Sequence, residues 1–196
     1  TYALAVQIFS TIMASAKSHQ IPLICDFGTL LGLIRDDKIM EWDDDIDFAI
    51  LPSDSQQVEQ WLLNEVSQCS LPVELTIERR RDVNGVTNAF LLSFDSLIYY
   101  PFITSISVRE CVDGQSIHLP SCGQWYAPAL HFEQFEEYTW QDLKINVPYQ
   151  YREYLSFLYG DWQTVKKFIN MTDYEHINDV AAEAIVEKSM QSEKLR

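Results

Sequence analysis

The sequence predicts a mixed α+β fold, with a sheet that is flanked by helices. Residues 2–19 carry apolar side chains at helical spacing, which indicates an amphipathic helix that packs on a core. The apolar run Phe48-Ala49-Ile50-Leu51 indicates a strand that enters a core. Residues 88–147 hold several short strand patterns and the hairpin signal Asp113-Gly114.

The other elements follow from the same periodicities. Helices are expected at residues 53–69 and 151–159, strands at 21–25, 73–78, 89–94, 97–104 and 106–111, and a second hairpin over 136–147 that turns at 141–142. A basic run, 79–81, is expected to be a solvated turn, with phosphate binding as the alternative. The tail is polar and helix-prone. We therefore predict a domain over residues 1–170 and a helical C-terminal extension over residues 171–196.

Composition and charge exclude several classes of protein. The net charge of −15 disfavours binding of bulk nucleic acid, because phosphates need a basic surface. The four cysteines form no CxxC pair, so neither a zinc knuckle nor a disulfide framework is expected. The chain has no signal peptide and no apolar run of membrane-spanning length, which favours a cytoplasmic location. Because it starts at Thr1, it could be a module of a larger enzyme whose other domains associate with a membrane.

The most informative stretch is a group of four aspartates just before the apolar run, at positions 43, 44, 45 and 47. In a strand, alternate side chains share a face, so Asp43, Asp45 and Asp47 line one face. Three carboxylates on one face repel one another unless a counter-charge is present. A hard divalent cation with oxygen ligands is the simplest counter-charge, so this stretch predicts a metal-binding strand.

The aspartates have two other interpretations. A solvated acidic turn before a strand would need no metal, but the apolar run places these acids at the end of a buried strand. An EF-hand loop has a similar first half, with acids at alternate positions. It needs a glycine where this chain has Phe48, and it needs a flexible loop where this chain has a strand pattern.

A second candidate site precedes the aspartates. Gly28 allows close approach of the backbone, and Thr29 can cap a helix, so a helix that starts here would offer its N-terminus to an anion. Arg35 is one of few nearby cations. Many strand-to-helix turns share this pattern, and Arg35 would also suit the surface at the end of a helix.

Together, these segments resemble the LicD family, which includes bacterial phosphocholine transferases and fukutin-related ribitol-phosphate transferases. The resemblance rests on Phe27-Gly28-Thr29-Leu30-Leu31-Gly32 with Arg35, and on Trp42-Asp43-Asp44-Asp45-Ile46-Asp47. A second block agrees with the C-terminal signature of that family, from Leu143 through Tyr154-Leu155 to Tyr159-Gly160-Asp161-Trp162. The two blocks cover about a third of the chain in the order that the family has them.

The resemblance implies a nucleotidyltransferase-like mixed sheet with added β-hairpins. It implies that Asp45 and Asp47 bind Mg²⁺ or Mn²⁺ at a catalytic centre, with Asp43 as a weaker third member. Gly28, Thr29 and Arg35 would bind the phosphates of a CDP-linked donor. The enzyme would transfer a phospho-alcohol from that donor to a sugar hydroxyl on a cell-surface glycan.

Related enzymes place a further carboxylate on a later strand beside this pair. In the family it directly precedes a segment like Tyr99-Tyr100-Pro101-Phe102, where this chain has Ile98. The nearest candidate is Asp95, which suits a turn equally well, and Glu74 is the fallback.

Three alternative functions share the aspartate pair. The first is a nucleotidyltransferase that leaves the nucleotide on its acceptor, and the second is a glycosyltransferase. The third is a catalytically inactive relative that binds a glycan through its aromatic side chains.

Overall fold

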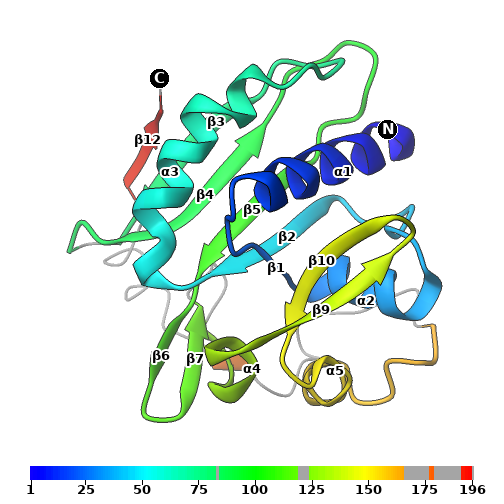
Figure 1. Cartoon of the computed structure of the whole chain (residues 1–196), viewed down its shortest axis with the longest axis vertical. Coiled ribbons are helices and arrows are strands. Elements are labelled where there is room, and N and C mark those ends of the chain that lie inside the picture. Colours follow the sequence, from blue (N-terminus) through cyan, green and yellow to red (C-terminus); the bar gives the residue numbers. More distant parts are fainter. Residues whose placement is uncertain (83, 119–123, 166–176, 179–190, 196) are drawn as a thin grey trace.

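The computed structural model describes residues 1–82, 84–118, 124–165, 177–178 and 191–195. Its largest feature is an eight-stranded mixed sheet with the strand order β12-β3-β4-β5-β2-β1-β10-β9 (Figure 1). A smaller sheet has the order β11-β8-β7-β6, and its β6–β7 hairpin projects below the large sheet in Figure 1. The predicted mixed sheet with helices and added hairpins is therefore confirmed.

The helices are α1 (Tyr2–Ser18), α2 (Phe27–Asp36), α3 (Ser55–Asn64), α4 (Leu130–Glu133) and α5 (Tyr151–Tyr159), with 3-10 turns η1 (Pro52–Asp54) and η2 (Val66–Gln68). The strands of the large sheet are β1 (Ile24–Cys25), β2 (Asp45–Ile50), β3 (Thr76–Arg81), β4 (Thr87–Ser93), β5 (Ile103–Val108), β9 (Phe135–Trp140), β10 (Leu143–Pro148) and β12 (Gln191–Lys194). The smaller sheet contains β6 (Glu110–Val112), β7 (Gln115–His118), β8 (Gln124–Pro128) and β11 (Ile177–Asn178).

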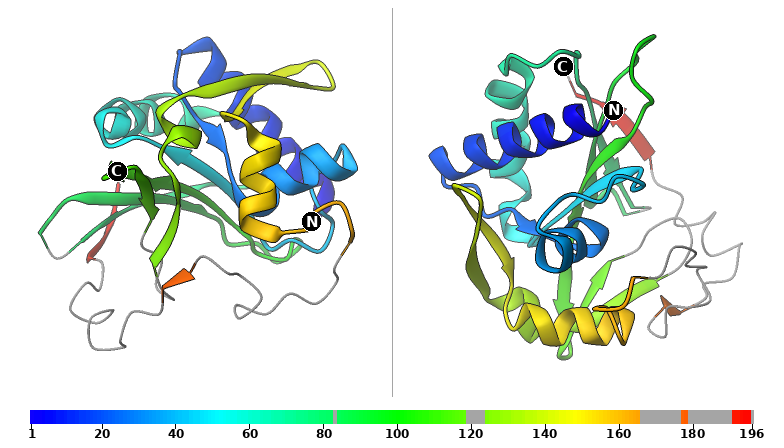
Figure 2. Two further views of the ribbon diagram at one scale, coloured as in Figure 1. Left: turned by 90° about the horizontal axis from the view of Figure 1, so that it is seen from below. Right: turned by 90° about the vertical axis from the view of Figure 1, so that its right-hand side faces the viewer.

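Helices α1 and α3 pack across one face of the large sheet (Figures 1 and 2). They contact each other where the Trp61 indole donates a hydrogen bond to Ser15 Oγ at 3.0 Å. The apolar stripe of α1 is buried as its spacing predicts, and Phe9 stacks on Phe48 of β2 with ring centroids 5.8 Å apart. This packing fixes β2, the strand that carries the aspartates, in the middle of the core.

Several predicted elements differ from the observed ones. The strand expected at 97–104 begins only at Ile103, because residues 94–102 form the connection between β4 and β5. The basic run lies within β3 and is not a solvated turn. Arg79 forms ion pairs with Glu59 of α3 and Glu193 of β12, which hold its guanidinium against the sheet.

The C-terminal extension was predicted to be helical, but its described parts are strands. Gln191–Lys194 pairs with β3 in antiparallel register and covers the edge of the large sheet, where backbone groups would otherwise lack partners. Ile177–Asn178 pairs with β8. The rest of the predicted extension lies outside the described residues. In the described part of the chain, no helix is both long and apolar enough to cross a bilayer.

Candidate active site

The pairing of β1 with β2 brings the two candidate segments together. In this antiparallel pair Cys25 lies opposite Phe48, so the start of α2 lies beside the aspartates that begin β2. The Asp26 backbone N–H donates to Asp47 O at 3.0 Å. The Asp47 N–H donates in turn to Thr29 Oγ1 at 2.9 Å. The glycine-threonine turn and the acidic strand therefore form one site.

Three of the four aspartates form a close cluster. One carboxylate oxygen each from Asp43, Asp44 and Asp45 lies within 4.8 Å of the others, a separation that a single cation can bridge. Asp43 Oδ2 is buried and has no hydrogen-bond partner. Within the described ranges, no arginine or lysine forms an ion pair with the aspartates at 43, 44, 45 or 47. In the described chain these carboxylates thus lack a directly paired basic side chain, which fits a divalent cation.

The close packing of these carboxyl groups also raises their pKa values. Burial, followed by the charge of Asp45, raises the pKa of Asp43 to about 7. Burial and the charge of Asp44 raise the pKa of Asp45. For Asp47, burial with the nearby Asp45 and Asp26 raises the pKa well above its ordinary value. A bound cation would favour the ionised form of all three groups.

Asp47 lies deeper along β2 than the cluster. Its Oδ1 accepts a hydrogen bond at 3.0 Å from Ser105 Oγ, which lies directly opposite it on the parallel strand β5. Asp45 lies opposite Ile103 in the same register. Strand β5 therefore presents a serine and an isoleucine to the predicted metal-binding pair, where a further carboxylate would complete the shell.

Asp95 lies two residues beyond the end of β4 and is exposed. Because β5 separates β4 from β2, the two strands are about 10 Å apart across the sheet. Asp95 is not part of the close carboxylate cluster in the described chain, and its catalytic role stays a prediction.

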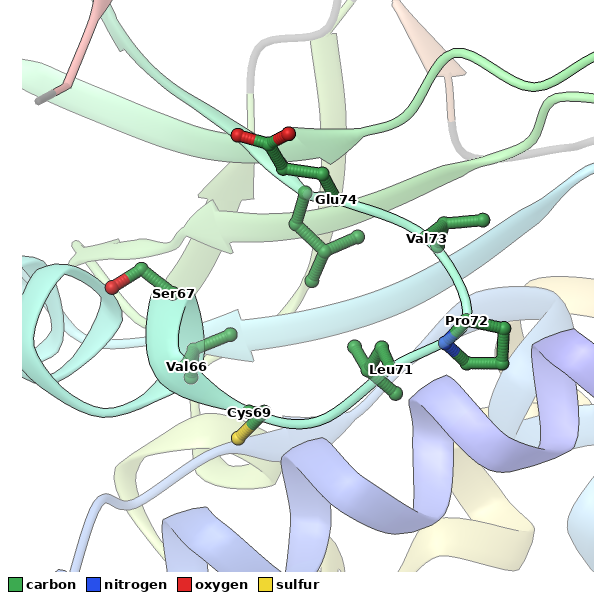
Figure 3. A pocket seen from close by; sticks show the side chains of 8 residues that line it. Val66, Ser67, Cys69, Leu71, Pro72, Val73 and Glu74 are labelled. Atoms are coloured by element: carbon green, nitrogen blue, oxygen red, sulfur yellow. The ribbon is translucent and has the colours of Figure 1, made fainter.

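Glu74, the fallback, lies in a different region. It lines a cavity of about 310 Å³ between η2 and the segment that leads into β3. Figure 3 shows this cavity, with Cys69, Leu71 and Pro72 beside it. Strands β4 and β5 separate β3 from β2, so Glu74 does not face the aspartates.

The predicted phosphate-binding residues have varied surroundings. A Cβ atom placed on Gly28 would lie 2.5 Å from Asp43 Oδ2, so the backbone at Gly28 packs against the carboxylate cluster. Thr29 is buried and does not cap α2, whose N-cap is Asp26. The Arg35 guanidinium binds the Asp36 carboxylate through Nε and Nη2, at 3.0 and 2.7 Å. Arg35 Nη2 also contacts Met40 Sδ at 3.4 Å, and the Met40 methyl group lies near Gly28.

A buried network that the sequence analysis missed supports the start of α2. Asp26 Oδ2 accepts a hydrogen bond from Arg109 Nε at 2.8 Å and forms an ion pair with Arg109 Nη2 at 2.7 Å. Asp26 Oδ1 accepts hydrogen bonds from Phe27 N and the Tyr154 hydroxyl. Burial raises the pKa of Tyr154 well above its usual value, so its hydroxyl stays protonated. The Arg109 guanidinium also packs over the Phe27 and Phe132 rings, at 5.0 and 4.2 Å from their centroids.

This network acts on a strained residue. Phe27 has a φ of 42°, in the left-handed region that bulky side chains seldom adopt. Its N–H and its ring are both held by the network, so Asp26 and Arg109 stabilise the turn that places Gly28 beside Asp43. Sequence offered one signal for this network, because Tyr154 belongs to the block that resembles the family's C-terminal signature.

Comparison with known proteins identifies the family of the chain. Residues 20–150 match the family described as LicD/FKTN/FKRP, nucleotidyltransferase domain. The chain belongs to the LicD family. The match includes α2, β2 and β5, the elements that build the site, and it ends just before α5.

Comparisons with individual proteins give less information than the family match. No curated protein matches the chain. Among solved structures, the chain is similar to the crystal structure of ANT(2")-Ia in complex with adenylyl-2"-tobramycin, with 13% sequence identity and a TM-score of 0.42. That match covers 78% of this chain and 76% of the other.

Proposed function

We propose that this LicD-family chain is a metal-dependent phosphotransferase. It would move a phospho-alcohol, such as phosphocholine or a polyol phosphate, from a CDP-linked donor to a sugar hydroxyl of a cell-surface glycan. The observation that carries the metal dependence is the buried, unpartnered Asp43 Oδ2 within a cluster of carboxylates that has no paired cation among the described residues. The family carries the reaction class.

In this proposal Asp45 and Asp47 hold Mg²⁺ or Mn²⁺, and Asp43 adds a ligand or orients one. The cation, when bound, neutralises the donor pyrophosphate and stabilises the leaving phosphate. The first turn of α2 has backbone N–H groups that lack intrahelical partners, so it can bind phosphate oxygens beside the cluster. Arg35 would release Asp36 to bind the same phosphates, and Asp95 would accept the proton of the attacking hydroxyl.

The direct test is to measure Mn²⁺ binding by calorimetry and CMP release from CDP-choline or CDP-ribitol. Asp45→Asn and Asp47→Asn keep the side-chain shape but remove a charged ligand, so turnover should fall by about a thousandfold or more. The metal-free variants should be as stable as the wild type or more stable, because a like-charge repulsion is relieved. Asp142→Asn, in the exposed turn between β9 and β10, is the matched control. Unchanged Mn²⁺ affinity in Asp45→Asn would refute the assignment.

The second candidate function is a non-catalytic relative that binds a glycan. It is favoured by the Ser105 and Ile103 side chains, which occupy the positions on β5 that face the aspartate pair. This candidate predicts glycan binding without CMP release at any metal concentration. A nucleotidyltransferase would instead leave CMP attached to the acceptor, which mass spectrometry of the product distinguishes.

A further inference from the structure

An apolar protrusion stands beside the acidic cluster. It belongs to the connection between β4 and β5, residues 94–102. Leu97 is fully exposed, and Ile98 and Tyr100 are 85% and 83% exposed. These are the most exposed large apolar side chains in the described part of the protein. A contiguous group of this kind usually marks a surface that meets a partner or a membrane.

The base of this connection is fixed. Phe94 and Phe102 are buried and pack edge to face, with ring centroids 5.1 Å apart. Ser96 Oγ accepts hydrogen bonds from two backbone N–H groups, those of residues 98 and 99, each at 3.1 Å. The Tyr100 N–H donates to Thr1 Oγ1 at 2.9 Å, which ties the connection to the start of α1 (Figure 1). The exposed side chains are therefore held outward from an ordered base.

The protrusion continues to the site. Ile103 begins β5, is partly exposed, and donates its N–H to Asp44 O at 3.3 Å. Two further exposed aromatic side chains belong to segments that meet this region: Trp42 lies two residues before Asp44, and Tyr2 follows Thr1, the residue that accepts the hydrogen bond from Tyr100. We call these six residues the apolar rim: Tyr2, Trp42, Leu97, Ile98, Tyr100 and Ile103.

We propose that the apolar rim docks on an electrically neutral lipid surface. Its side chains have the types that suit a membrane interface, because the aliphatic Leu97 and Ile98 can enter the hydrocarbon while the Tyr and Trp rings lie at the headgroup level. The charge of the molecule selects the kind of lipid. The adjacent aspartates and the net charge of −15 repel anionic headgroups. A zwitterionic surface has no net charge, so it does not repel the protein in this way.

A second copy of the chain suits the rim less well. A two-fold contact through the rim would bring the acidic clusters of both copies close together, and their like charges repel. The lipid proposal does not depend on the proposed transferase activity. If both hold, the rim would place the site against a glycan acceptor that is carried on a lipid, and that consequence rests on the proposed function.

The test is sedimentation of the whole chain with phosphatidylcholine vesicles, without metal or donor. Leu97→Ser/Ile98→Ser/Tyr100→Ser should weaken binding by about tenfold or more, because three apolar side chains no longer enter the interface. The control variant Val86→Ser/Val112→Ser/Phe135→Ser removes three exposed apolar residues elsewhere and should bind like the wild type. Circular dichroism and thermal unfolding verify that both variants fold. Vesicles with equal parts of phosphatidylcholine and phosphatidylglycerol should bind more weakly.

Four outcomes would overturn the proposal. One is wild-type protein that fails to sediment with phosphatidylcholine vesicles. Another is equal binding by the wild type and the rim variant, or stronger binding to the anionic vesicles. The last is a dimer in analytical ultracentrifugation that the rim substitutions abolish, which would assign the rim to a second copy. None of these outcomes bears on the metal and donor tests of the proposed transferase.

Discussion

At the scale of single residues, two glycines of α2 have different tasks. A Cβ on Gly28 would meet the Asp43 carboxylate, the end of a side chain that can turn away. A Cβ on Gly32 would lie 2.6 Å from the carbonyl oxygen of Lys38, a backbone atom in a fixed turn. Gly28 therefore governs the shape of the acidic cluster, and Gly32 governs the packing of the segment that leads into it.

This difference gives a paired prediction. Gly28→Ala should displace Asp43 and weaken Mn²⁺ binding by about tenfold, with a loss in unfolding free energy below about 1 kcal/mol. Gly32→Ala should instead destabilise the chain by roughly 2 kcal/mol or more, because backbone must shift to admit the methyl group. Calorimetry and urea unfolding measure the two effects. Equal effects of both substitutions on Mn²⁺ affinity would refute the division of roles.

At the scale of elements, the pairing of β2 with β5 decides the composition of the site. The parallel register sets Ser105 opposite Asp47, within hydrogen-bond distance, on the face where the aspartates lie. Any residue at position 105 therefore faces the predicted metal site. Asp95 reaches no such position through strand pairing, because the β4–β5 register ends at Leu92 and Thr104.

We expect Ser105→Asp to add a carboxylate beside Asp45 and Asp47. It should tighten Mn²⁺ binding by about tenfold, since ligand charge sets the affinity for a hard cation. It should also lower the melting temperature of the metal-free protein, because a further buried carboxylate repels its neighbours. Ser105→Asn has nearly the same shape without the charge and serves as the control. If Mn²⁺ affinity changes alike in both variants, position 105 does not face the metal.

At the scale of the whole molecule, the Asp26–Arg109–Tyr154 network joins three parts of the fold. Asp26 precedes α2, Arg109 lies where β5 of the large sheet continues into β6 of the smaller one, and Tyr154 is in α5. All three residues are buried. The network therefore links the two sheets and α5 to the start of the helix that borders the site.

Loss of one member should be severe. Arg109→Met leaves the Asp26 carboxylate buried without its cation and should cost about 3–5 kcal/mol in urea unfolding. Adding Asp26→Asn should recover part of that loss, because the unpaired charge is removed. Lys17→Met breaks an exposed ion pair with Glu137 and should cost less than about 1 kcal/mol. A loss near the Lys17→Met value for Arg109→Met would contradict the importance of the network.

Much of the fold was accessible from the sequence, because local periodicity reflects which side of an element is buried. The stripe of α1, the buried run of β2, the β9–β10 hairpin and α5 were all predicted near their observed positions. Periodicity does not predict an element whose position depends on tertiary contacts. Residues 97–102 are apolar enough to resemble a strand, yet they leave the sheet, and the polar segment 191–194 joins it by pairing with β3.

The sequence by itself determined the site's ingredients: four aspartates before a buried strand, a glycine-threonine turn, and the resemblance to the LicD family that residues 20–150 bear out. Only the tertiary structure decided which residues surround them. Ser105 lies 58 residues from Asp47, and Arg109 and Tyr154 lie 83 and 128 residues from Asp26. Such partners depend on which strands become neighbours and in what register, and local spacing carries no record of either.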